Sequence, residues 1–116
     1  MDLTPLQLSE QCQAWALELS DKCLVVASYE VKNKEALLEL KRAQAKATLA
    51  IKGTAQPSVI KIMIENDTGV RETADKQLAA EALLIIGKAE LDGIEAKFQA
   101  AKQCLQLKIQ EMRNGV

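Results

Sequence analysis

The sequence has no histidine, three aromatic residues, two prolines and five glycines among its 116 residues. Without histidine, Ser-His and Cys-His catalytic pairs are excluded, and so is the Glu-x-x-His motif of di-iron helical bundles. So few glycines and prolines argue against an all-β fold, which needs many turns. No apolar run approaches the roughly 20 residues of a membrane span, so we expect no membrane partner.

The charge balance and the cysteines also narrow the function classes. The formal net charge of −1 gives the chain no overall attraction to nucleic acid or to a membrane. Residues 1–20 lack the features of a secretory signal, so we expect a cytoplasmic protein. The cysteines are odd in number and show no Cys-x-x-Cys spacing: Cys12, Cys23 and Cys104. We predict reduced thiols that are buried and inert, with a reactive thiol as the alternative.

Candidate catalytic and metal-binding groups are sparse. No glycine-rich phosphate-binding loop occurs. Acids at helical spacing, such as Asp92 with Glu95 and Glu72 with Asp75, could hold a metal in a bundle, but they are typical of solvated helix faces. We therefore predict no catalytic residue, no metal, no cofactor and no small-molecule substrate, and expect that the protein is not an enzyme.

The residues that are abundant (Ala, Leu, Ile, Glu, Lys and Gln) are typical of long helices. We predict an all-α fold in one domain, 1–116: a long helical hairpin with helices over 5–52 and 70–113. Thr4 and Pro5 form a good helix start, and Gly53 a good helix end. A short helix at the tip is predicted over 58–66, capped by Ser58. The β-branched segment 59–64 could also be a strand, but the chain offers no second strand to pair with it.

Both long helices carry a heptad seam that suits a coiled coil. In the first, the seam residues are Cys12, Leu19, Val26, Asn33, Leu40 and Ala47, with Trp15, Lys22, Tyr29, Ala36, Ala43 and Ala50 three residues after each. In the last, they are Leu84, Leu91, Phe98, Leu105 and Met112, alternating with Gly87, Ile94, Ala101 and Lys108.

Three seam and helix positions are polar or lack a side chain. Asn33 is predicted to set the register, and the alternative is a hinge or partner site. Gly87 and Gly93 interrupt the last helix, where each costs about 1 kcal/mol relative to Ala. We expect close approach of a neighbouring backbone to offset that cost.

The turn and the charges together predict antiparallel pairing of the long helices. If Gly53 lies beside Val70, the two heptads meet in step, with Leu40 beside Leu84. In that register the acidic segment 1–30 faces the basic segment 96–113, and the basic segment 41–63 lies beside the acidic segment 65–81. Parallel pairing would place like charges together.

One hairpin seam cannot bury all of the apolar surface, because a two-helix seam covers only a narrow stripe of each helix. We predict a homodimer that forms a four-helix bundle, with higher even oligomers and a partner protein as further expectations. The predicted interface residues are Leu24, Val25, Leu37, Leu38, Ile62, Met63, Ile64, Leu83, Ile85 and Ile86. In the predicted register, Leu37 and Leu38 join the patch at 83–86.

The basic tip segment 41–61 is the one candidate nucleic-acid surface. Its candidate contacts are Lys41, Arg42, Lys46, Lys52 and Lys61. No aromatic side chain is interleaved there to stack on bases, as single-strand binders usually provide. The competing interpretation is that these charges pair with Glu72 and Asp75. The leading function is thus a self-associating interaction protein, and the alternative is a nucleic-acid-binding accessory protein of recombination or replication.

The order of elements resembles small helical-hairpin proteins of phages and prophages, commonly encoded near replication or recombination genes. The resemblance lies in a long helix ending Ala50-Ile51-Lys52-Gly53, a short element begun by Ser58, a turn at Asp67 leading into Val70, and a long last helix. It covers most of the chain and implies an accessory role in DNA metabolism. It carries over no functional residues.

Overall fold

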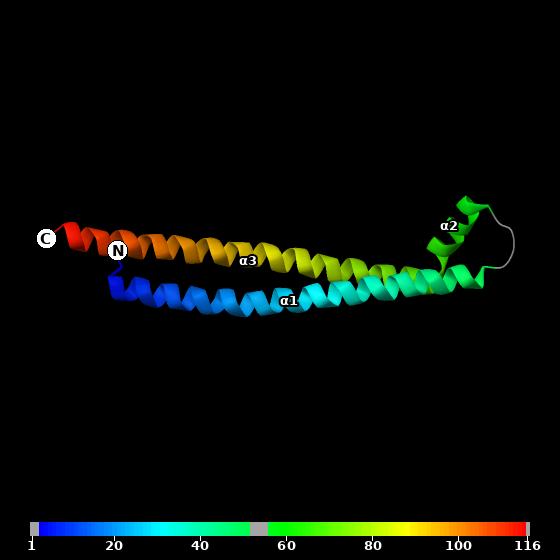
Figure 1. Cartoon of the computed structure of the whole chain (residues 1–116), viewed down its shortest axis with the longest axis horizontal. Coiled ribbons are helices and arrows are strands. Elements are labelled where there is room, and N and C mark those ends of the chain that lie inside the picture. The colour runs from blue at the N-terminus through cyan, green and yellow to red at the C-terminus, as the bar shows by residue number, and fades with distance from the viewer. Residues whose placement is uncertain (1–2, 52–55, 116) are drawn as a thin grey trace. The chain divides into compact units, whose positions relative to one another are not determined.

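Residues 3–51 and 56–115 are described by a computed structural model, in which they form three α-helices and no strand. Helix α1 spans Pro5–Ala50, α2 spans Pro57–Asn66 and α3 spans Thr68–Asn114. The two long helices pair as a hairpin through the short α2, which confirms the predicted fold class (Figure 1). Segment 59–64 is helical, and the predicted ends of α1 and α3 lie within two residues of the observed ones.

The start of α1 is closed by a reciprocal pair of hydrogen bonds. The Gln7 backbone N–H donates to Thr4 Oγ1 at 3.2 Å, and the Thr4 N–H donates to Gln7 Oε1 at 2.9 Å. This is a capping box, which satisfies two backbone donors that the helix leaves without intrahelical partners. The predicted helix start at Thr4 is therefore confirmed, whereas the predicted stop at Gly53 lies outside the described residues.

The other two helix starts differ from the prediction by one or two residues. Helix α2 begins at Pro57, because proline suits the first helical turn, and its N-cap is Gln56 without a side-chain cap. The predicted Ser58 cap is therefore wrong. Helix α3 begins at Thr68 because Asp67 Oδ1 accepts a hydrogen bond from the Val70 N–H at 3.1 Å.

The predicted seams are confirmed by burial except at one end of each. Every predicted seam position of α1 from Cys12 to Ala47 is buried or half-buried, and so is every one of α3 from Leu84 to Lys108. Ala50 and Met112 are exposed. Both lie in the last turns of their helices, where the observed register leaves them beyond the paired segment.

The described contacts fall into two compact units. Unit 1 comprises 1–27 and 86–116, and unit 2 comprises 28–85. In unit 1 the core residues include Leu8, Val26 and Ala101, each 5–7% exposed. Lys22 pairs with Glu90 in a salt bridge, and the Lys97 ammonium lies 5.2 Å from the Trp15 ring centroid. The two contacts show that α1 and α3 run antiparallel in this unit.

Unit 2 has a polar contact in its seam. Gln77 Nε2 donates to Asn33 Oδ1 at 3.4 Å, and both residues are half-buried. The unit buries Ala47 at 7% and Val70 at 5% exposure. The contact supports the prediction that Asn33 sets the register, because an amide pair inside a seam is lost when either helix slides.

The predicted register itself is wrong. It would place Trp15 beside Lys108, but Trp15 lies against Lys97, about three helical turns nearer the start of α3. It would likewise place Asn33 beside Glu90, but Asn33 meets Gln77. The prediction took the turn at Gly53 as the point of pairing. In the observed hairpin α2 occupies much of the connection, so α1 continues past the start of α3.

The predicted charge pairing at the tip is not observed. Among the described residues, Lys41, Arg42 and Lys46 form no salt bridge with Glu72 or Asp75. Gly93 likewise has no backbone beside it: a Cβ built there meets nothing within 4 Å in the described part of the chain. The expected close approach is therefore absent at Gly93, whereas Gly87 is buried in the seam.

Candidate interaction surfaces

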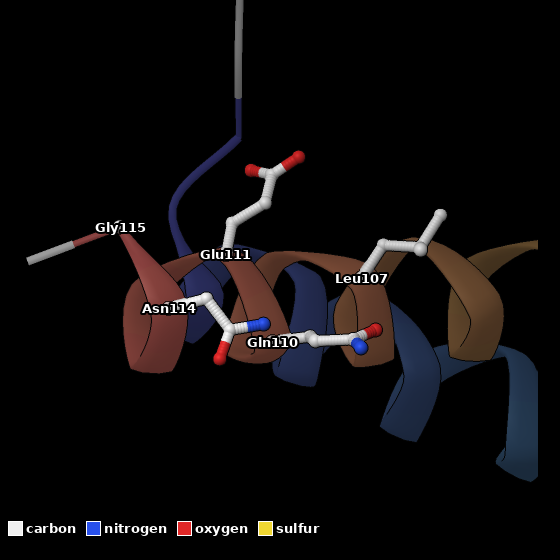
Figure 2. Close-up of a pocket in the computed structure, with 5 residues that line it drawn as sticks. All are labelled: Leu107, Gln110, Glu111, Asn114 and Gly115. Atoms are coloured by element: carbon white, nitrogen blue, oxygen red, sulfur yellow. The ribbon is translucent and has the colours of Figure 1, made fainter.

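Several surface hollows occur among the described residues. One of them lies on the last turns of α3 and is lined by Leu107, Gln110, Glu111, Asn114 and Gly115. Figure 2 shows that four of them come from α3 and that Gly115 directly follows its end, with the side chains of Leu107 and Glu111 projecting away from the ribbon. A ligand pocket needs walls from several directions and convergent polar groups. This hollow has one wall and one carboxylate.

Within the residues that the structure describes, no three His, Cys, Asp or Glu side chains gather as a metal site would require. The cysteines are all free, and the prediction that they are buried is wrong for two of them. Cys12 is half-buried, but Cys23 and Cys104 are exposed. Both lie beside the seam rather than on it, so each faces solvent.

An exposed apolar surface lies on α1, on the side opposite the hairpin seam. Five residues recur there every seven positions: Leu17, Leu24, Val31, Leu38 and Ala45. The four large ones are 68%, 70%, 55% and 51% exposed, in that order. We call this set the outer stripe of α1. Its seven-residue spacing matches that of the seam, so the helix has two apolar faces and the hairpin covers one of them.

Sequence reasoning identified two of the five stripe residues. Leu24 and Leu38 were among the predicted interface residues, because each lies in an apolar run. Val31, between Glu30 and Lys32, was missed because its neighbours in the sequence are polar, and Leu17 and Ala45 were missed because neither was related to the others by the spacing of seven. The sequence does contain the pattern. Each stripe residue follows a seam residue by five positions, as Leu17 follows Cys12, so the stripe repeats every seven residues as the seam does.

The other predicted interface residues differ in their exposure. Val25 and Leu37 are only just exposed, at 38% each, and Ile64 is half-buried on α2. The remaining five are 48–61% exposed: Ile62, Met63, Leu83, Ile85 and Ile86. Helix α2 buries none of its residues, so its apolar surface is covered on one side only.

The predicted join between Leu37, Leu38 and the patch at 83–86 is wrong within unit 2. Because Asn33 lies against Gln77, Leu37 is level with about residue 73 of α3. Leu83 then lies roughly 15 Å further along the helix axis, at about 1.5 Å per residue. The predicted register would have placed Leu37 beside the patch at 83–86. The observed register is shifted along α3 and separates them.

The basic tip segment is open to solvent where the structure describes it. Lys41, Arg42, Lys46 and Lys61 are exposed, and none of them forms a salt bridge with a described residue. Lys52 lies outside the described residues. Glu65 and Asp75 line a hollow of unit 2 together with Leu40, the residue before Lys41. Neither acid forms a salt bridge with Lys41. The competing interpretation, internal neutralisation of these charges, is therefore not supported by the observed contacts.

Comparison with protein-family models, with curated proteins and with solved structures found no match for this chain. None of the described helices combines the length and the apolar character that crossing a membrane requires.

Proposed function

We propose that this protein is a non-enzymatic, self-associating coiled-coil interaction protein. The observation that carries the proposal is the outer stripe of α1, whose four large residues are each more than half exposed. Fully burying one such side chain stabilises a complex by about 1.5–3 kcal/mol. Large contiguous apolar surface on a helix is typical of a protein interface.

The small core of the hairpin also supports association with a second copy. Among the described residues, five apolar side chains are buried, each with 5–7% of its surface still exposed: Leu8, Val26, Ala47, Val70 and Ala101. Two of the five are alanines, which contribute little apolar area. A two-helix seam with so small a core gains much of its stability by packing against further helices, as in a four-helix bundle.

The test is the solution mass, measured by sedimentation equilibrium or by light scattering across 1–100 µM protein. We expect a dimer or a higher even oligomer, with an apparent mass that falls on dilution. A mass of one chain, 12.7 kDa, over the whole range would contradict the proposal. Replacing Leu17 and Leu24 by Gln should shift the mass toward one chain, and Leu107→Gln with Met112→Gln serves as a matched control at exposed positions of α3.

A second candidate function is binding of single-stranded nucleic acid by the tip. The supporting observation is that Lys41, Arg42 and Lys46 are exposed and without a salt-bridge partner among the described residues. Phosphate contacts by such side chains give affinity that falls steeply with salt. Several copies side by side would raise that affinity by multivalency. This function agrees with the accessory role in DNA metabolism that the phage resemblance implies.

The test is fluorescence anisotropy of a labelled oligonucleotide at low and at physiological salt. Micromolar binding that weakens with salt, and that is lost when Lys41, Arg42 and Lys46 are changed to Glu, would support it. A matched control carries the same change of charge at scattered exposed positions: Lys76→Glu, Lys102→Glu and Arg113→Glu. Absence of binding at low salt would contradict this second function.

A further inference from the structure

We propose that the outer stripe of α1 packs antiparallel against the outer stripe of a second copy, so that the acidic first half of one α1 lies on the basic second half of the other. The inference rests on the proposed self-association and names its partner and geometry. The even spacing of the stripe residues permits this pairing, and the order of the charges along α1 favours its direction.

The positions are symmetric about the middle of the stripe. Val31 lies midway between Leu24 and Leu38, and also midway between Leu17 and Ala45. In an antiparallel pair centred on Val31, Leu24 of one copy meets Leu38 of the other, and Val31 meets its own equivalent. Such a contact is self-complementary, as a two-fold interface must be.

Three small residues beside Leu24 leave room for a large side chain of the second helix, whereas the residues beside Leu38 are long and charged. Ser20, Ala27 and Ser28 flank Leu24, and all are exposed. Large side chains of one helix can pack over small residues of the other, which is the arrangement seen where helices interdigitate.

The charges favour the antiparallel direction over the parallel one. Before Val31, α1 carries Glu10, Glu18, Asp21 and Glu30, with Lys22 as its one base. After Val31 it carries Lys32, Lys34, Lys41, Arg42 and Lys46, with Glu35 and Glu39 as its acids. Antiparallel pairing sets opposite charges against each other at both ends, whereas parallel pairing sets like charges together.

The same arrangement provides partners for the basic tip. In the register centred on Val31, Asp21 of one copy is level with Lys41 of the other, and Ser20 is level with Arg42. These basic residues are exposed and lack a salt bridge within the described chain. The acidic half of a second α1 would supply carboxylates to them. Dimerisation and nucleic-acid binding would then compete for one basic segment.

Disulfide trapping tests the geometry directly. In a variant whose three cysteines are changed to Ser, Val31→Cys should form a disulfide with its own equivalent, because the two-fold axis brings these residues together. Leu17→Cys should not, because its equivalent lies 28 residues away along the axis, or roughly 40 Å. A disulfide requires Cα atoms within about 7 Å. Mixing Leu17→Cys with Ala45→Cys should yield the mixed dimer.

The outcomes separate this inference from the proposed function. Cross-linking of Val31→Cys without Leu17→Cys supports the antiparallel stripe. Equal cross-linking of both would show a parallel pair and overturn the inference. An oligomeric mass without either cross-link would overturn the inference and leave self-association standing, whereas a mass of one chain would overturn both.

A charge exchange in the native-cysteine protein gives a second readout, should the cysteine variants fail to fold. Asp21→Lys alone and Lys41→Asp alone should each raise the dimer dissociation constant at least tenfold. The double variant should recover most of the affinity, because the opposite charges meet again across the interface. Equal losses without recovery in the double variant would contradict the pairing of Asp21 with Lys41.

Discussion

Replacing Gly87 and Gly93 separately by alanine should change the free energy of unfolding in opposite directions. Both glycines lie inside α3, where alanine is favoured over glycine by about 1 kcal/mol because glycine loses more backbone entropy on folding. At Gly93 the added Cβ meets nothing within 4 Å, so the whole gain should appear. For a chain of this length, that corresponds to a rise in Tm of roughly 3–6 °C.

At Gly87 the same methyl group enters a buried seam position. Overpacking a closely packed site costs about 1–3 kcal/mol, which exceeds or cancels the helical gain. We therefore expect Gly87→Ala to leave the stability unchanged or to lower it by up to about 2 kcal/mol. Since the two variants make the same chemical change, they control for one another.

The measurement is urea unfolding followed by circular dichroism at 222 nm, at one fixed protein concentration because association adds to the apparent stability. A gain of about 1 kcal/mol at both positions would refute the close packing of the seam at Gly87. A loss at Gly93 would show that another chain covers this part of α3, contrary to the open space found there.

Further predictions concern a cap, the core and the polar seam pair, all measured by the same unfolding assay. Asp67→Ala should lower the free energy of unfolding by about 0.5–2 kcal/mol because the Val70 N–H loses its acceptor, while Asp67→Asn should lower it much less. Equal losses of stability in the two variants would refute the role of Asp67 as the cap. Val26→Ala should cost about 1–3 kcal/mol by leaving a cavity, and Val59→Ala, at a position 46% exposed, should stay within about 0.5 kcal/mol. Comparable costs at both sites would contradict the burial. Asn33→Ala should cost about 0.5–1.5 kcal/mol through loss of the amide contact, and an unchanged midpoint would mean that this contact contributes nothing.

Local patterns were sufficient to predict the helices and their inward faces. The capping residues around Thr4 and the turn at Asp67 act through hydrogen bonds within four residues, so they can be read without knowing the fold. The heptads likewise identify the seams, because a strict repeat of seven residues keeps Cys12 through Ala47 on one face of a supercoiled helix. The same period contains the outer stripe, although Leu17 and Val31 become noticeable only when the hairpin has covered the other face.

Register and charge pairing depended on the tertiary structure. A heptad seam repeats, so several registers bury similar residues, and sequence offers no strong reason to prefer one. The observed register, marked by the Asn33–Gln77 and Lys22–Glu90 contacts, is about three turns away from the one that the turn and the charges predicted. That displacement leaves Lys41, Arg42 and Lys46 without the acids expected to neutralise them. The sequence alone thus determined which residues form helices and which faces are apolar, because those follow from contacts a few residues apart. Only the tertiary structure decided which charges remain available to a partner, because that depends on how far one long helix slides along the other.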